Sequence, residues 1–207
     1  MHKLLIILFF LIITNSSTYS QETSNKTSKT EISILFIGNS LTYTNNLPEL
    51  VKKYAKQKRI RIHTKMVAFP NHAIEDHWND RKVQKLISSK KYDFVIIQQG
   101  PSSQYNGRKM LLEYGKKYSD LCKINEAKLC YFMVWPSLHN YHTFDGVIKN
   151  YADAASINNA ILFPVGAAWK NYIDTTNNKK YYGLDGFHPS IKGSKIAAKV
   201  IVNLLFE

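Results

Sequence analysis

Apolar runs of strand length alternate with segments of helical spacing along most of this chain. Five short runs predict strands, and they cover residues 32–37, 59–67, 92–97, 129–134 and 161–163. Segments with apolar residues three or four positions apart predict helices over 46–58, 74–89, 108–121, 145–157 and 190–205. Strands that alternate with helices form parallel sheets covered on both faces, so we expect one α/β domain with a parallel five-stranded sheet.

The first 20 residues follow a different plan. Residues 1–3 carry positive charge, residues 4–13 are an unbroken apolar run, and residues 14–20 are small and polar. This layout is typical of a secretory signal peptide, and the apolar run is too short to span a bilayer, which takes roughly 20 residues. We therefore predict a cleavable signal peptide over 1–20, a flexible leader over 21–30 and the folded domain over 31–207, in a secreted or periplasmic protein. A short membrane anchor is the alternative.

The composition allows a sizeable core but is strongly basic. Hydrophobic residues make up 44% of the chain, and 28 Lys and Arg against 15 Asp and Glu give a formal net charge of +13. The basic residues are scattered without an interleaved aromatic stripe, so we expect no nucleic-acid partner. They predict a solvated surface, with weak attraction to an anionic envelope surface as the alternative. Cys122 and Cys130 are too few for a four-cysteine zinc site and leave open a disulfide or two buried thiols.

The first predicted strand runs directly into a serine. It ends at Gly38, and Asn39, Ser40 and then Leu41 follow. In parallel sheets functional side chains gather at the carboxyl ends of strands, and we interpret Gly38 as allowing a tight turn there. Backbone N–H groups of a following helix could stabilise an oxyanion beside Ser40. An ordinary N-cap or turn serine is the alternative.

A second segment with catalytic potential precedes the last predicted helix. Residues 185–189 read Asp-Gly-Phe-His-Pro. A serine nucleophile needs a base, usually histidine, and the base needs a partner that fixes its tautomer, commonly a carboxylate. Asp185 and His188 could supply both from one tight turn. A surface loop with an exposed histidine is the alternative.

Together these two segments resemble the SGNH hydrolases, also called the GDSL esterase/lipase family. The resemblance extends over nearly all of residues 21–207 in order, spacing and strand–helix alternation. It implies a three-layer α/β/α sandwich of flavodoxin-like topology. It also implies that Ser40 is the nucleophile, His188 the base and Asp185 the orienting acid. Asn39 stands where aspartate is more usual in the family.

The resemblance is looser at the groups that would hold the oxyanion. Asn71 falls nearest the family's second-block glycine, whose backbone N–H contributes to the hole, and asparagine tolerates left-handed turns. Straight counting puts Ser102 in the place of the third-block asparagine, but the amide donor could instead be Gln98 or Gln99, of which we favour Gln98. Loss of one oxyanion donor costs roughly 100–1,000-fold in rate, so these departures concern efficiency.

The loop after the fourth predicted strand also carries histidines. His139 and His142 lack a third ligand nearby, so we expect no metal. We interpret this loop, with Trp135 and Tyr141, as part of the wall of a substrate cleft.

These observations predict a secreted serine esterase that hydrolyses O-acyl esters, with O-acetyl groups on carbohydrate as the expected substrate. The expected partner is a small-molecule or glycan ester, and the mechanism needs no cofactor. The alternatives are a lipase or lysophospholipase-like acyl hydrolase, an acetyltransferase with the same triad, and a non-catalytic carbohydrate-binding relative.

Overall fold

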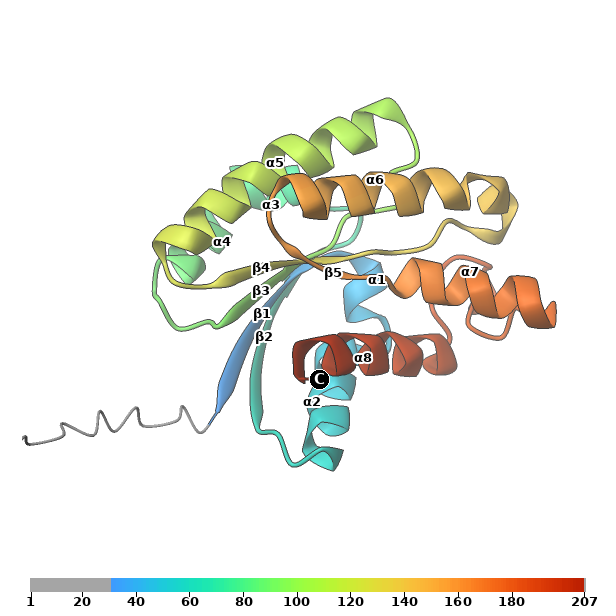
Figure 1. Ribbon diagram of the computed structural model, residues 1–207, viewed down its shortest axis with the longest axis horizontal. Helices are drawn as coiled ribbons and strands as arrows, with labels where there is room; N and C mark the ends of the chain where they lie inside the picture. The colour runs from blue at the N-terminus through green and yellow to red at the C-terminus, as the bar shows by residue number, and fades with distance from the viewer. Residues whose placement is uncertain (1–30, 207) are drawn as a thin grey trace, which may run out of the picture.

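Five parallel strands form one sheet in the order β2-β1-β3-β4-β5 in the computed structural model, which describes residues 31–206 (Figure 1). The strands are β1 Ile32–Gly38, β2 Ile62–Ala68, β3 Phe94–Ile97, β4 Lys128–Phe132 and β5 Ile161–Phe163. β1 lies inside the sheet, where Ile34 pairs with Thr64 of β2 and Phe94 of β3. This strand order is that of flavodoxin-like sheets, so the expected fold class is confirmed. The predicted signal peptide and leader, residues 1–30, lie outside the described residues.

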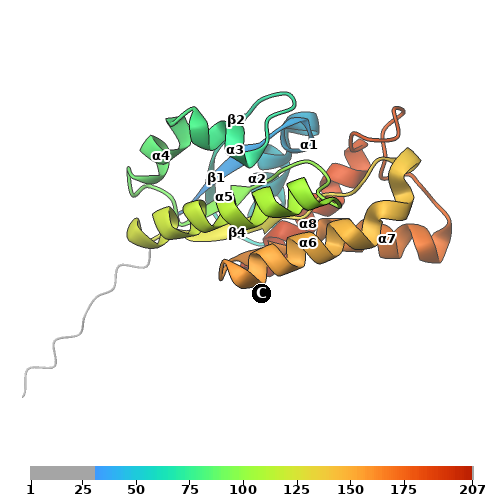
Figure 2. The ribbon, with the colours of Figure 1, turned by 90° about the horizontal axis from the view of Figure 1, so that it is seen from above.

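Helices cover both faces of the sheet and complete three layers. One face carries α3 Ile74–Asn79, α4 Lys82–Ile87, α5 Tyr105–Ile124 and α6 Phe144–Ile157. The opposite face carries α2 Leu47–Gln57 and α8 Ile191–Phe206, with α7 Val165–Thr176 beside α8 (Figure 1). From above, α5 and α6 lie side by side across the sheet (Figure 2). None of the helices in residues 31–206 combines the length and apolar character needed to cross a membrane.

Most of the predicted elements are present, but one helix prediction was wrong and one helix was not predicted. The single helix expected over 74–89 is two, because Arg81 adopts a left-handed conformation with φ 58° between α3 and α4. Nothing was predicted at α7, which the chain nevertheless forms. Its buried residues, Val165, Gly166, Trp169 and Ile173, have helical spacing, so the signal was present in the sequence and was overlooked.

The core is built on β1 and on a pair of stacked tryptophans. Residues 34–37 of β1 have no exposed surface. Trp135 and Trp169 stack with ring centroids 3.5 Å apart, and both are fully buried. The expectation that Trp135 forms part of a cleft wall is therefore wrong: it is a core residue.

The two cysteines are buried thiols. Cys122 and Cys130 are both free and nearly inaccessible, so the disulfide alternative is excluded in this structure. Burial raises the pKa of the Cys122 thiol to about 12, and it also raises the pKa of Cys130. A thiol that stays protonated is a poor nucleophile, so both act as small apolar residues.

Candidate active site

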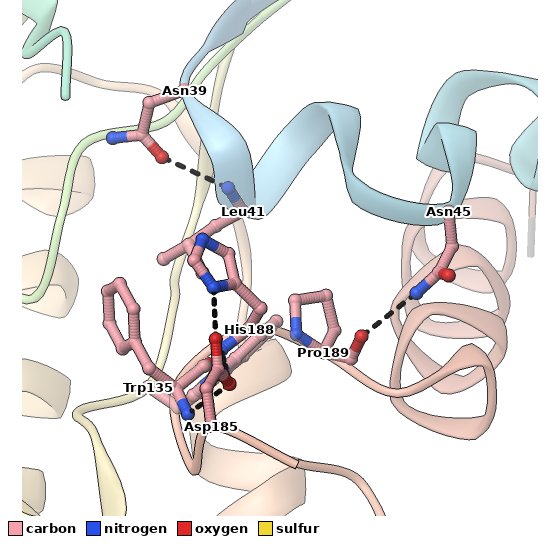
Figure 3. Close-up of polar contacts among 8 residues, drawn as sticks. Asn39, Leu41, Asn45, Trp135, Asp185, His188 and Pro189 are labelled. Atoms are coloured by element: carbon pink, nitrogen blue, oxygen red, sulfur yellow. Dashed lines mark hydrogen bonds and ion pairs between the residues drawn. The ribbon is translucent and has the colours of Figure 1, made fainter. Parts of the chain in front are cut away.

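The candidate nucleophile lies where β1 ends, at the carboxyl edge of the sheet. Asn39 is the N-cap of the short helix α1 Ser40–Tyr43, and Ser40 is its first residue. Asn39 Oδ1 accepts a hydrogen bond from Leu41 N at 3.1 Å (Figure 3). Asparagine suits this place because its side chain satisfies an N–H that has no acceptor within the helix. Ser40 is half-buried and lines a cleft of about 360 Å³.

Gly38 serves close packing rather than a left-handed turn. Within residues 31–206, the glycine that has a positive φ is Gly186. A β-carbon on Gly38 would lie 2.4 Å from Thr42 Oγ1 and 2.5 Å from Gln98 Oε1. The prediction that Gly38 allows a tight turn was therefore wrong. Glycine is required because two side chains pass directly over its α-carbon.

A buried hydrogen-bond network supports the start of α1. Gln98 Oε1 accepts from Asn39 N at 2.9 Å and from Thr42 Oγ1 at 2.8 Å. Gln98 Nε2 donates to Asn39 Oδ1 at 3.0 Å and to Gln99 O at 2.8 Å. Asn39 Nδ2 in turn donates to His72 O at 3.0 Å. The residue before Ser40 is thus fixed from two sides.

This network leaves Gln98 without a free donor. Both of its amide hydrogens already donate within the protein, and only 1% of the residue is exposed. The geometry therefore does not support Gln98 as the side-chain donor to an oxyanion. Its buried amide explains instead why a glutamine follows β3: it satisfies polar groups of Asn39 and Thr42 that would otherwise be unpaired.

The other two predicted oxyanion residues do line the cleft beside Ser40. Asn71 has φ 60°, the left-handed conformation that its type tolerates. The backbone N–H groups of Ser40 and Asn71 make no hydrogen bond to any other residue that the structure describes. The Ser102 hydroxyl, by contrast, accepts from Gln99 Nε2 at 2.8 Å and donates to Gly100 O at 2.9 Å. The free backbone donors here are thus the N–H groups of Ser40 and Asn71, and the Asn71 side-chain amide also makes no hydrogen bond among the described residues.

A hydrogen bond joins Asp185 and His188, the predicted orienting acid and base. His188 Nδ1 lies 2.5 Å from Asp185 Oδ2, which fixes the tautomer with the proton on Nδ1 when the ring is neutral (Figure 3). Asp185 Oδ1 accepts from the backbone N–H groups of Phe187 and His188, both at 2.9 Å. The hydrogen bond from His188, followed by that from Phe187 N, lowers the pKa of the Asp185 carboxyl. The carboxylate is thus held ionised beside the ring.

Contacts from three other elements hold this loop in place. Trp135 Nε1 donates to Phe187 O at 2.9 Å, and Asn45 Nδ2 donates to Pro189 O at 2.9 Å (Figure 3). Leu138 N donates to Gly186 O at 2.8 Å, and the φ of 68° at Gly186 allows the turn. Since these donors come from the segment after β4, from the segment after α1 and from η2 Leu138–Thr143, the loop that carries His188 has a fixed position.

The imidazole of His188 faces the first turn of α1. Figure 3 shows the ring between Asp185 and the Asn39–Leu41 segment, with its second nitrogen on the side away from Asp185. Ser40 stands between the labelled Asn39 and Leu41 in the chain. Among residues 31–206, no hydrogen bond joins the Ser40 hydroxyl to His188. Catalytic hydrogen bonds are often long in the free enzyme and tighten when substrate binds, so this arrangement is compatible with a serine–histidine pair.

His77 is a buried residue near the site that the sequence did not reveal. Only 1% of it is exposed, and its Nε2 donates to Gly38 O at 2.7 Å. Burial lowers the pKa of His77 and outweighs the hydrogen bond to Gly38, which acts in the opposite direction. A neutral ring therefore secures the end of β1. The available signal was its place three residues after Ile74, the other buried residue of α3.

The two histidines of η2 differ in their surroundings. His142 lines a second pocket next to the Ser40 cleft, whereas His139 lines neither of these two pockets. Tyr141 points elsewhere and donates to Asp174 Oδ1 at 2.6 Å. The expectation of a cleft-lining loop thus holds for His142 and not for Tyr141. No group of three metal-ligating side chains occurs in the part of the chain that the structure describes.

Comparisons with protein-family models and with curated proteins find no match for this sequence. Solved structures do match. A provisionally assigned SGNH hydrolase from Slackia heliotrinireducens is 22% identical, with a TM-score of 0.71 over 84% of this chain and 99% of that one. A lipase/acylhydrolase from Enterococcus faecalis is 15% identical, with a TM-score of 0.69 over 83% and 94%. The acetyl xylan esterase AlAXEase is 14% identical, with a TM-score of 0.67 over 84% and 100%.

These likenesses extend over nearly the whole of the matched structures. At such low identities they concern the backbone arrangement, and they agree with the strand order and layers described above. The chain has the three-layer α/β/α fold of the SGNH hydrolases.

Proposed function

We propose that this chain is a serine ester hydrolase of the SGNH family, which cleaves O-acyl esters through an acyl-enzyme. One observation carries the proposal: the Asp185–His188 pair faces the turn that begins with Ser40, at the carboxyl edge of the sheet. In this arrangement Ser40 is the proposed nucleophile, His188 the proposed base and Asp185 the proposed orienting acid. Solved esterases and lipases with the same fold support the reaction class.

The residues have distinct roles in the proposed mechanism. His188 Nε2 takes the proton of the Ser40 hydroxyl as Ser40 Oγ attacks the ester carbonyl. Asp185 holds the ring in the correct tautomer and stabilises the imidazolium that forms. When the tetrahedral intermediate collapses, the ester C–O bond breaks and His188 returns the proton to the leaving alcohol. A water molecule, deprotonated by His188, then hydrolyses the acyl-enzyme and releases the carboxylic acid and Ser40.

Backbone groups are the proposed oxyanion donors. The N–H groups of Ser40 and Asn71 line or border the cleft and have no acceptor among the described residues. Donors of this kind are oriented before the reaction and stabilise the charge that develops in the transition state. With Gln98 and Ser102 engaged elsewhere, the proposed hole relies on these backbone groups rather than on Gln98 or Ser102.

The proposed acyl group is short, with acetate as the favoured case and carbohydrate as the favoured alcohol. The cleft of about 360 Å³ is close to the lower end of ligand pockets, which measure about 300–1,000 Å³. Small side chains and glycines, including Ala73, Gly100 and Gly107, line it. An acetyl xylan esterase shares the fold, which supports acetylated carbohydrate as the substrate class.

The proposed site of action is outside the cytoplasm, in keeping with the signal-peptide pattern of residues 1–20. Attraction to an anionic envelope surface remains part of this proposal. Residues 47–61 and 191–206, which form α2, α8 and an adjoining loop, carry nine Lys and Arg against one Glu. All nine basic residues are exposed. Recovery of a processed N-terminus near Gln21 from the exported fraction would support this location, and an intact N-terminus in the cytoplasm would overturn it.

Hydrolysis of aryl esters of increasing chain length tests the proposal. We expect the purified protein to cleave 4-nitrophenyl acetate and to lose activity on 4-nitrophenyl octanoate. Ser40→Ala should reduce the acetate rate to that of the buffer while leaving the thermal unfolding curve unchanged. Preference for octanoate would point to a lipase-like enzyme. A folded protein without activity on any ester would favour the carbohydrate-binding alternative.

A further inference from the structure

A second pocket adjoins the Ser40 cleft. It measures about 600 Å³ and is called here the η2 pocket. Its polar lining consists of Ser103, Gln104, Ser137, Asn140, His142 and Thr143. Pro101 and Phe187 line both pockets, so they form the partition between the η2 pocket and the cleft. A bound molecule could therefore extend over this partition from one pocket into the other.

The polar side chains of the η2 pocket are free to bind a ligand. Those of Ser103, Gln104, Ser137, Asn140 and His142 make no hydrogen bond to another residue in the described range 31–206. In the Ser40 cleft, by contrast, Asn39, Gln99 and Ser102 donate or accept within the protein, and the side chains of Ser40 and Asn71 are the ones without a hydrogen bond among the described residues. The η2 pocket thus offers hydroxyl, amide and imidazole groups that can exchange water for the hydroxyls of a ligand.

The absence of charged residues from the lining of the η2 pocket favours an uncharged ligand. No Lys, Arg, Asp or Glu lines the η2 pocket, in a chain with a formal net charge of +13. Phosphate and carboxylate groups are usually recognised by Arg or Lys, and such residues are absent from this lining. The side chains of Pro101, Pro136 and Phe187 supply apolar surface between the polar groups. Neutral sugars combine hydroxyls with apolar C–H faces, and this lining complements both.

The η2 pocket lies close to the residue that would protonate the leaving alcohol in the proposed reaction. Phe187 directly precedes His188, and their ring centroids lie 5.2 Å apart. Leu138 N of η2 donates to Gly186 O, so the pocket wall and the loop that carries the base are joined. In ester cleavage the base returns its proton to the leaving alcohol, which must therefore lie next to His188. The η2 pocket begins at Phe187, next to the histidine that would return this proton.

We propose that the η2 pocket binds the alcohol part of the ester, a neutral, hydroxyl-rich carbohydrate, while the acyl group occupies the Ser40 cleft. This assignment rests on the proposed function. It makes Asn140 and His142 specificity-determining residues, since both are exposed on η2 and have unused hydrogen-bonding groups. His139 is an exposed histidine of the same η2 segment that does not line the pocket.

The experiment compares two substrates in variants Asn140→Ala, His142→Ala and His139→Ala. The substrates are 4-nitrophenyl acetate, whose leaving group has no sugar hydroxyls, and partially O-acetylated xylo- and manno-oligosaccharides. We expect Asn140→Ala and His142→Ala to raise KM for an oligosaccharide about tenfold each, the effect of one lost hydrogen bond. Their kcat/KM on aryl acetate should stay within about twofold of the parent protein, by the same reasoning. His139→Ala should match the parent on both substrates.

Two kinetic results would overturn the assignment. One is an equal loss on both substrates in the pocket variants. The other is a parent protein that cleaves aryl acetate but neither binds nor cleaves these oligosaccharides. If the parent lacks activity on every ester, the proposed function fails, and calorimetric titration with deacetylated oligosaccharides then tests the pocket by itself. Binding that Asn140→Ala weakens would sustain the η2 pocket as a carbohydrate site, and no binding would overturn it.

Discussion

Gln98 and Asn39 hold each other through a reciprocal pair of hydrogen bonds at the carboxyl ends of β3 and β1. Gln98 Oε1 accepts from Asn39 N at 2.9 Å, and Gln98 Nε2 donates to Asn39 Oδ1 at 3.0 Å. Ser40 follows Asn39 directly, so this pair determines where α1 and its first residue begin. The amide of Gln98 therefore acts as a support for the candidate nucleophile, from behind the cleft.

Removal of this support should affect stability. Gln98→Ala leaves Asn39 N and the Thr42 hydroxyl without their buried acceptor, at about 1–3 kcal/mol for each unpaired group. We expect the free energy of unfolding in urea to fall by about 2–4 kcal/mol. Gln57→Ala, at an exposed position of α2, is the control and should change little. Unchanged stability with a rate loss of roughly 100–1,000-fold would instead identify Gln98 as an oxyanion donor.

Gly38 and Gly100 provide a matched test of close packing. In Gly38→Ala the new methyl group would lie 2.4 Å from Thr42 Oγ1 and 2.5 Å from Gln98 Oε1, so at least one of the hydrogen bonds there must break. We expect a loss of about 1–3 kcal/mol, as for other overpacked sites. A β-carbon on Gly100 meets no atom within 4 Å, and Gly100→Ala should unfold like the parent. Equal thermal unfolding midpoints for the two variants would contradict the packing account.

The substitution Asp185→Asn tests whether Asp185 orients His188, because it should lower the rate without changing the stability of the fold. The variant's amide oxygen can still accept from the N–H groups of Phe187 and His188, but its NH₂ group would face His188 Nδ1. The ring would then be held in the wrong tautomer, which costs about 10⁴ in a serine protease triad. We expect kcat on aryl acetate to fall by about 10³–10⁴ with a normal unfolding curve. Activity within tenfold of the parent would show that Asp185 does not orient His188.

The burial of His77 predicts that the free energy of unfolding depends on pH. Because burial lowers its pKa from 6.5, the unfolded chain binds a proton at His77 more readily than the folded chain does. Stability from this residue is therefore complete above pH 6.5 and declines as the pH falls from there toward the lowered pKa.

His77→Gln, which keeps a donor for Gly38 O, should reduce the loss of stability between pH 7 and pH 5 in urea titrations. His139→Gln, at an exposed position of η2, is the control and should retain the parent's pH profile. An identical pH profile in His77→Gln and the parent protein would show that His77 has no part in the effect.

The buried strands and amphipathic helices could be predicted because their patterns depend on burial, which is periodic in sequence. The 32–37 run became β1, and the helical spacing over 145–157 became α6 with a difference of one residue at its start. α7 was missed although its buried residues have helical spacing. The break at Arg81 was missed because a left-handed residue of this type has no distinctive sequence signal.

The candidate triad could be predicted because Ser40, Asp185 and His188 stand in short, distinctive segments. The supporting contacts could not. The bonds from Gln98 to Asn39, from His77 to Gly38 O and from Trp135 to Phe187 O join residues that are far apart in the sequence. Residue type alone does not distinguish a glutamine that stabilises an oxyanion from one that satisfies buried backbone groups.

Covalent labelling tests the central claim, that His188 activates Ser40 as a nucleophile, most directly. The protein is incubated with a fluorophosphonate ester, digested and analysed by mass spectrometry. The account predicts one phosphonyl adduct on the peptide that contains Ser40, no adduct in Ser40→Ala, and labelling slowed at least 100-fold in His188→Ala, the scale of general-base catalysis. A folded protein that is not labelled at Ser40, or is labelled there at the same rate without His188, would contradict it.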